Sequence, residues 1–132
     1  MCLFCSDLVE NGYVYTMTMS ISDLKTLRKA VIERVLEGDG KASNAQRRAA
    51  FDNSGLAKPL STLIDKVAKY SYKVSDEDIA AVKASGLNED QIFELVICAA
   101  IGQANRQYET AFAALNAATK QKGGSHASED SQ

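Results

Sequence analysis

The sequence predicts an all-α domain of about five helices, one of them long and central. Three observations favour this fold. Apolar residues recur at spacings of three and four in successive segments, short turn motifs separate those segments, and no convincing strand falls in the core. The single proline, Pro59, lies in the first half of the chain. Together these features indicate a bundle-like helical domain rather than one built on a sheet.

The longest helix is predicted from Asn88 to about Thr119. Asn88 and Gln91 have the spacing of a capping box, which marks a helix start. The run from Leu95 to Gly102 is apolar on all sides, so we expect it to be covered on every side. It is too short to cross a bilayer, which needs about 20 apolar residues. This helix should therefore lie at the centre of the fold.

Two helices are predicted before Pro59. The first starts with Ser22 as its N-cap and ends at Gly38-Asp39-Gly40, which has C-cap and turn chemistry. The second runs from Asn44 to Phe51 and is broken by Asn53-Ser54-Gly55. The apolar stripe of the first helix is Leu24, Leu27, Val31 and Val35.

Two more helices are predicted between Pro59 and the long helix. Pro59 suits a first helical turn, where its missing N–H is not needed. After an irregular segment at 70–74, Ser75 restarts a helix with Asp78 in capping-box position, and Gly86 is a C′ residue. The buried stripe of the earlier helix is expected to be Leu60, Leu63, Ile64, Val67 and Ala68.

The chain is expected to have three parts. Residues 1–18 form an N-terminal arm or extension, and both a disordered arm and a short docked segment stay open for them. Residues 19–120 form the helical domain. Residues 121–132 are rich in Gly, Ser and acids and are expected to be a disordered tail.

Composition narrows the function classes. The 132 residues are 45% hydrophobic with a net charge of −2, so no broad basic surface for nucleic acid is predicted, and Arg47 and Arg48 are expected to be a solvated pair. Three cysteines give no disulfide framework and no signal peptide is evident, which favours the cytoplasm. We expect no membrane partner and no cofactor. The single histidine, His126, excludes a metal site with several histidines.

A family resemblance appears from Val74 to Leu95, which reads VSDEDIAAVKASGLNEDQIFEL. This run, and more loosely residues 60–115, resembles the alkylhydroperoxidase D and carboxymuconolactone decarboxylase family. The resemblance implies an all-α, alkylhydroperoxidase D-like fold. It also implies protomers that associate through helical hairpins as a homo-oligomer, a trimer, hexamer or dimer.

The redox members of that family carry Cys-x-x-Cys-x-x-x-His about eight residues before the glycine. Aligned on Gly86, these positions fall on Ser71, Val74 and Asp78. A thiol peroxidase needs a thiolate, a resolving thiol and a proton relay, which these three residue types do not supply. The chain therefore resembles the fold without its redox residues.

Two cysteines elsewhere have dithiol spacing. Cys2 and Cys5 form a Cys-x-x-Cys at the extreme terminus, with no helix pattern after it and no nearby histidine. We favour a flexible end, with a displaced redox dithiol as the alternative. Cys98 lies in the most apolar segment and is expected to be a small buried hydrophobe.

Glu94 is the acid with the strongest functional case, because it stands beside the all-apolar run. A salt bridge to Arg47, Arg48, Arg106 or Lys66 would explain it structurally. The catalytic alternative is a general base with a raised pKa at the mouth of a pocket.

Tyr70 and Tyr72 lie where the family would place its active-site entrance. They are packing residues or, alternatively, hydroxyl donors to a bound substrate. Gly102 is explained either by a close helix crossing at a subunit contact or by tolerance of a glycine within the helix.

Three functions follow, in this order. The first is a non-redox family relative, a helical oligomer that binds a small molecule or partner. The second is an antioxidant peroxidase-type oxidoreductase using Cys2 and Cys5. The third is a decarboxylase or lyase acting on a lactone or keto acid with Glu94 as base. Oligomerisation is expected separately, because the helices offer surplus apolar surface at Ala111, Ala113, Ala114, Ala117 and Ala118.

Overall fold

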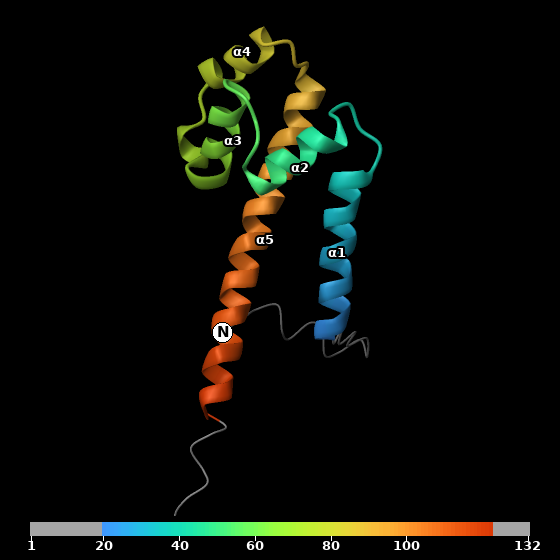
Figure 1. The fold of residues 1–132 in the computed structure, drawn as a ribbon, viewed down its shortest axis with the longest axis vertical. Helices are drawn as coiled ribbons and strands as arrows, with labels where there is room; N and C mark the ends of the chain where they lie inside the picture. Colours follow the sequence, from blue (N-terminus) through green and yellow to red (C-terminus); the bar gives the residue numbers. More distant parts are fainter. Residues whose placement is uncertain (1–19, 123–132) are drawn as a thin grey trace, which may run out of the picture. The chain divides into compact units, whose positions relative to one another are not determined.

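The computed structural model describes residues 20–122, and within them the chain is all-α, as predicted (Figure 1). The described residues contain no strand. The helices are α1 (Ile21–Glu37), α2 (Asn44–Asp52), α3 (Leu60–Lys69), the 3₁₀ helix η1 (Ser71–Lys73), α4 (Asp76–Ala84) and α5 (Glu89–Lys122).

The chain divides into two compact units, Met1–Val31 and Ile32–Gln132. The described part of the first unit is Ser20 and the first eleven residues of α1, where Leu24, Leu27 and Val31 are about half exposed. The second unit holds the last turns of α1 and all the other helices. The candidate site described below lies wholly within this second unit.

Local capping sets most helix starts. At α4 the Ser75 N–H donates to Asp78 Oδ2 at 2.9 Å, and at α5 Asn88 and Gln91 exchange N–H to side-chain bonds of 3.0 and 2.9 Å. Both predicted capping boxes are thereby confirmed. The predicted N-cap of α1 is wrong by two residues. Ser20 precedes the first helical residue and donates its N–H to Asp23 Oδ2 at 3.1 Å, so Ser22 lies inside the first turn.

Left-handed residues end two helices. Asn53 has φ of 51° after α2, and Gly86 has φ of 106° two residues after the end of α4. Asparagine and glycine tolerate this conformation better than other residues. These two positions confirm the breaks predicted at 53–55 and at Gly86.

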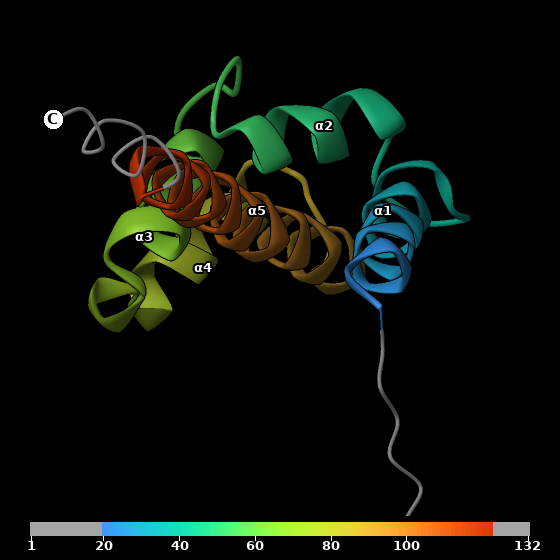
Figure 2. The ribbon, with the colours of Figure 1, turned by 90° about the horizontal axis from the view of Figure 1, so that it is seen from below.

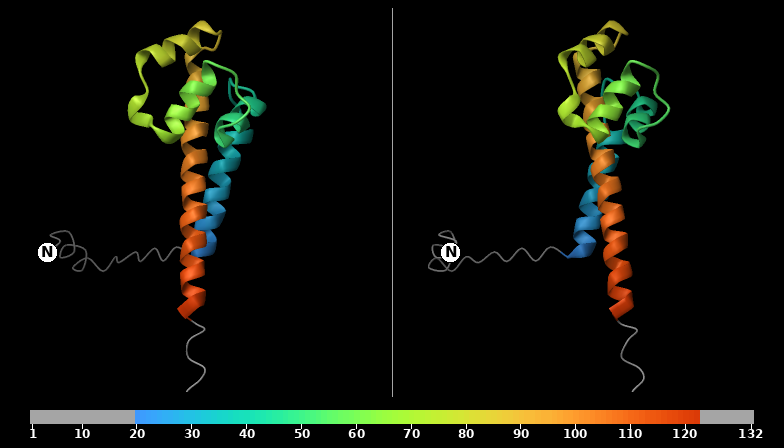
Figure 3. Two further views of the ribbon diagram at one scale, coloured as in Figure 1. Left: turned by 60° about the vertical axis from the view of Figure 1, so that its left-hand side comes forward. Right: turned by 90° about the vertical axis from the view of Figure 1, so that its left-hand side faces the viewer.

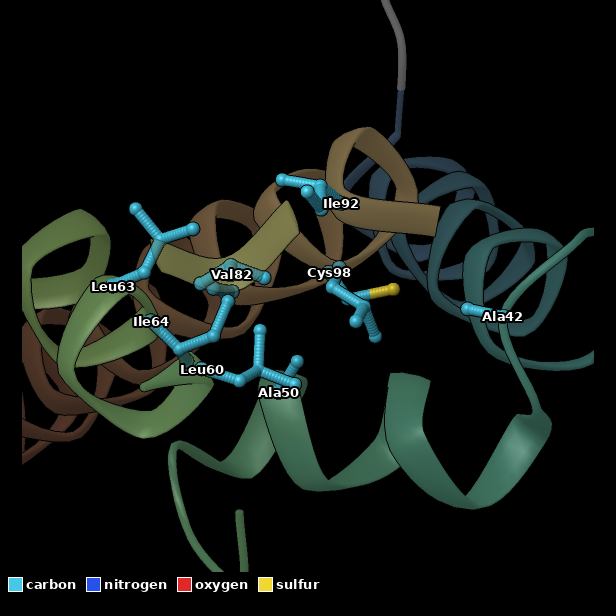
Figure 4. Close-up of a cluster of buried hydrophobic side chains, with 10 residues drawn as sticks. Ala42, Ala50, Leu60, Leu63, Ile64, Val82, Ile92 and Cys98 are labelled. Carbon is cyan, nitrogen blue, oxygen red and sulfur yellow. The ribbon is translucent and has the colours of Figure 1, made fainter. Parts of the chain in front are cut away.

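The core surrounds the first half of α5. Side chains from α2, α3 and α4 meet there, and Figure 2 shows α2 and α3 on different sides of α5. Figure 4 shows the cluster, which contains Leu60, Leu63 and Ile64 of the predicted α3 stripe. Val67 packs partly buried against it, and Ala68 is buried. The buried members are Ala42, Ala50, Leu60, Leu63, Ile64, Val82, Ile92, Leu95, Cys98 and Ala99.

The expectation that Leu95–Gly102 is covered on every side is wrong. Leu95, Cys98 and Ala99 are buried, but Ile97 is 36% exposed and Ala100 is exposed. An α-helix turns about 100° per residue, so neighbours that cover one broad face leave the other open. The exposed face starts one turn earlier, where Phe93 is 67% exposed.

Gly102 marks a close crossing of two helices within the chain. A Cβ atom on this residue would stand 2.0 Å from the backbone oxygen of Phe51, the last residue but one of α2. Arg106, one turn later on α5, donates from Nη1 to the same oxygen at 2.6 Å. The glycine is therefore explained by α2 packing against α5.

The second half of α5 extends beyond α2, α3 and α4 (Figures 1 and 3). From Gln107 to Gln121 every residue but Phe112 is exposed, and Leu115 is 59% exposed. None of the helices in residues 20–122 combines the length and the apolar character needed to cross a membrane.

Candidate functional site

Glu94 holds the turn between α1 and α2 against α5. Its Oε1 accepts a hydrogen bond from the Lys41 N–H at 2.7 Å, and its Oε2 accepts bonds from the N–H groups of Lys41 and Ala42 at 2.9 and 2.8 Å. Gly40 permits this approach, because a Cβ atom there would lie 2.7 Å from Oε2. The carboxylate thus stabilises the backbone that leads into α2.

This arrangement contradicts the predicted salt bridge of Glu94 and the predicted rise of its pKa. The four expected salt-bridge partners are engaged elsewhere: Arg48 with Glu37, Lys66 with Asp78, Arg106 with Phe51 O, and Arg47 with the end of α1. The Ala42 and Lys41 N–H groups lower the pKa of Glu94, and the charges of Arg47 and Lys41 add to this against the effect of burial. The expectation of a raised pKa is therefore wrong, and the catalytic role of Glu94 stays a prediction.

Arg47 caps the C-terminus of α1 from inside the fold. It is 5% exposed, and its Nη1 donates to the carbonyl oxygens of Val35 and Gly38 at 3.1 and 2.6 Å. Its Nη2 donates to Asn44 Oδ1 at 2.7 Å. These bonds satisfy carbonyl groups that a helix end leaves without intrahelical partners.

The expectation that Arg47 is solvated is wrong, although its neighbour Arg48 is exposed as expected. Sequence reasoning missed Arg47 as a site residue. The sequence shows an arginine nine residues after Gly38, but its hydrogen-bond partners are backbone carbonyl oxygens. Every residue has a carbonyl group, so no residue type in the sequence indicates these partners. The Nε atom of Arg47 is buried and has no hydrogen-bond partner.

A cavity of about 170 Å³ lies beside these two residues. Its walls come from the last turns of α1, the following turn, α2 and the first half of α5. The lining residues are Arg34, Val35, Asp39, Arg47, Phe93, Glu94, Ile97 and Cys98. The structure thus brings Glu94 and Cys98 to one cavity.

Cys98 is a poor nucleophile in this setting. The residue is 1% exposed, and its Sγ lies 3.9 Å from the Val35 carbonyl oxygen. Burial raises the pKa of the thiol, which keeps it protonated at neutral pH. The prediction that Cys98 is a small buried hydrophobe is confirmed.

The positions that correspond to the family's redox motif have structural roles or none. Ser71 is exposed in η1, and Val74 is partly buried against the core. Asp78 accepts two hydrogen bonds of 2.7 Å from the Lys66 ammonium group, which holds the pKa of Asp78 below its usual range. Cys2, Cys5 and His126 lie outside the described residues.

Tyr70 and Tyr72 do not reach the cavity beside Glu94. Tyr70 is 47% exposed and Tyr72 is 80% exposed. The ammonium group of Lys73 lies 4.8 and 5.7 Å from the centroids of their rings, which is cation–π distance. Neither tyrosine lines the cavity that Glu94 lines, so the two tyrosines and Glu94 do not form one substrate site there.

A second cavity, of about 290 Å³, lies where α2 leads into α3. Its acidic side chain, Asp65, is already paired with Lys69 and accepts a hydrogen bond from the Asn53 side chain at 2.9 Å. Across residues 20–122 no three His, Cys, Asp or Glu side chains lie close enough to hold a metal ion together.

The chain has no match among models of known protein families, curated proteins or solved structures. The family resemblance read from residues 74–95 therefore stays a prediction.

Proposed function

We propose that this protein is a non-redox relative of the alkylhydroperoxidase D and carboxymuconolactone decarboxylase family, a helical homo-oligomer that binds a small molecule or partner. The observation that carries the non-redox part is the ion pair of Asp78 with Lys66. Asp78 occupies the position where the resemblance would place a proton-relaying histidine. Its carboxylate accepts hydrogen bonds from Lys66 and from the Ser75 N–H at the start of α4. Such a group stabilises the fold and is not poised to move protons.

The acid–base alternative has less support. A lyase base must be unprotonated yet basic enough to take a proton, so its pKa should lie near the working pH. The pKa of Glu94 is lowered instead, and both of its oxygens already accept hydrogen bonds from the backbone. These contacts favour a structural role for Glu94.

The oligomer part of the proposal is supported by the exposed face of α5. Ala104, Ala111 and Ala118 recur every seven residues and are exposed. Leu115 lies four residues after Ala111, giving the three-and-four alternation of a coiled-coil seam. Alanines at such a seam let two helices approach closely, and a second copy of α5 carries the same pattern.

A peroxidase assay on the full chain tests the non-redox part. Consumption of cumene hydroperoxide, with dithiothreitol as the reductant, is followed for the natural protein and for the double variant Cys2→Ser, Cys5→Ser. We expect both proteins to consume peroxide at the same low rate as dithiothreitol alone. Rapid turnover that the double variant loses would contradict the proposal and support the antioxidant alternative.

A further inference from the structure

We infer that the cavity lined by Arg47, Glu94 and Cys98 binds a small neutral carbonyl compound, with its oxygen toward Arg47 and its apolar body between Val35, Phe93 and Ile97. This inference rests on the small-molecule part of the proposed function and names its site and ligand class. It does not depend on self-association.

The size of the cavity limits the size of its ligand. The cavity has a volume of about 170 Å³. An apolar protein cavity of about 150 Å³ holds one benzene molecule, so this one accommodates a ring of about six atoms with one small substituent. Larger ligands would have to displace the lining side chains.

The buried arginine favours a ligand with a hydrogen-bond acceptor. Arg47 is 5% exposed. Its Nη1 and Nη2 atoms donate hydrogen bonds, but its Nε atom has no partner among the described residues. Leaving a buried donor without an acceptor is unfavourable, because its bond to water is lost and not replaced. Because Arg47 lines the cavity, an acceptor placed there meets a guanidinium whose hydrogen bonds are incompletely satisfied.

Charge decides between a neutral acceptor and a carboxylate. The lining carries two arginines, Arg34 and Arg47, and two acids, Asp39 and Glu94, so its formal charge is zero. The ionised Glu94 would repel an anionic ligand at short range. A cationic ligand would meet the buried charge of Arg47. A neutral carbonyl oxygen accepts a hydrogen bond without either penalty.

The apolar wall supplies the remaining contacts. Phe93 and Ile97 lie one turn apart on α5, line the cavity and are 67% and 36% exposed, so they offer it apolar surface that is still in contact with water. Burying that surface under a ligand ring is favourable, because apolar surface is removed from water.

Three probes of similar size test the inference: cyclohexanone, cyclohexanecarboxylate and cyclohexylamine. Each is titrated into ¹⁵N-labelled full-length protein near pH 7, and backbone amide shifts are followed by NMR. We expect cyclohexanone to shift the amides of Val35 and Phe93–Cys98 saturably, with a Kd at least about tenfold below those of both charged probes. Absence of saturable shifts there, or equal binding of a charged probe, would overturn the inference.

Two variants sharpen the test. Ile97→Trp fills the cavity and should abolish the cyclohexanone shifts, whereas Ala113→Trp adds the same side chain elsewhere on α5 and should leave them unchanged. Circular dichroism verifies that both variants keep their helices. If Ile97→Trp binds cyclohexanone as the natural protein does, the cavity is not the site.

Glu94→Gln separates charge from shape, because it removes the negative charge and keeps one acceptor oxygen toward the turn. We expect the ratio of the Kd for cyclohexanecarboxylate to the Kd for cyclohexanone to fall about tenfold, because the repulsive charge is lost. An unchanged preference would contradict the charge argument. Light scattering on the same samples reports self-association separately, so a monomer that binds cyclohexanone would contradict only the oligomer proposal.

Discussion

Glu94 stabilises its surroundings through backbone hydrogen bonds rather than an ion pair. Three N–H contacts from two successive residues reach its two oxygens, and a glycine leaves room for them. A carboxylate in this position orders the chain between α1 and α2 and thereby places Arg47 at the end of α1. One charged side chain thus fixes a turn that is 52 and 53 residues away in sequence.

Replacing Glu94 by Gln should destabilise the fold near neutral pH by about 1–2 kcal/mol. A glutamine has one acceptor oxygen and no charge, and hydrogen bonds to charged groups contribute about 1.5–3 kcal/mol, less where solvent has access. Urea unfolding followed by circular dichroism measures the difference. The matched control is Glu89→Gln at the start of the same helix, where the side chain is 78% exposed and paired only with Lys83, and little change is expected. Equal effects in the two variants would contradict the role given to Glu94.

The stabilisation by Glu94 should depend on pH in one direction. Its pKa is lower in the folded protein than in the unfolded chain, so folding favours the ionised form. The contribution is complete at pH values above the ordinary pKa of a glutamate and is lost as the pH falls through the lower folded-state value. The difference in unfolding free energy between the natural protein and Glu94→Gln should therefore shrink below about pH 4. A difference that stays constant from pH 7 to pH 3 would rule this out.

At the scale of the elements, helices were predictable and their contacts were not. Ser75 with Asp78, Asn88 with Gln91, and Gly86 are local signals, since each acts on residues within four positions, and the structure confirms them. The bonds of Glu94 to Lys41 and Ala42 depend on how α5 meets a distant turn, which no local pattern encodes. For the same reason the prediction that Arg47 is solvated is wrong, since the fold buries this residue.

The crossing of α2 and α5 should depend on the absence of a side chain at Gly102. Gly102→Ala places a Cβ 2.0 Å from the Phe51 carbonyl oxygen, so α2 has to move and the Arg106 hydrogen bond to that oxygen is strained. Overpacking of this kind costs about 1–3 kcal/mol or more, while alanine gains about 1 kcal/mol in helix propensity. We expect a net loss of at least about 1 kcal/mol in urea unfolding.

The control for Gly102→Ala is Asn116→Ala, an exposed position on the same helix where only propensity changes. It should be neutral or slightly stabilising. A stabilised Gly102→Ala variant would mean that the two helices are not held at this distance, and that simple tolerance explains the glycine.

At the scale of the whole molecule, the second half of α5 needs an explanation. Isolated helices depend on packing of an apolar face for most of their stability, and Gln107–Gln121 is exposed apart from Phe112. Alanine favours helix formation by itself, but it does not explain the leucine at position 115, which is 59% exposed. A face that repeats every seven residues is better explained by another helix packed on it.

The natural protein should therefore be larger than a monomer at micromolar concentration, and Leu115→Glu should shift it toward the monomer. A glutamate at the centre of a seam would be desolvated and would face its own copy, which costs far more than the loss of one apolar contact. Size-exclusion chromatography with light scattering measures both proteins. Ala113→Glu, exposed on another face of α5, is the matched control and should keep the natural mass.

Because α5 holds the core and the cavity in its first half, the Leu115→Glu monomer should still bind cyclohexanone. A natural protein that is strictly monomeric would leave the exposed face of α5 without its proposed partner.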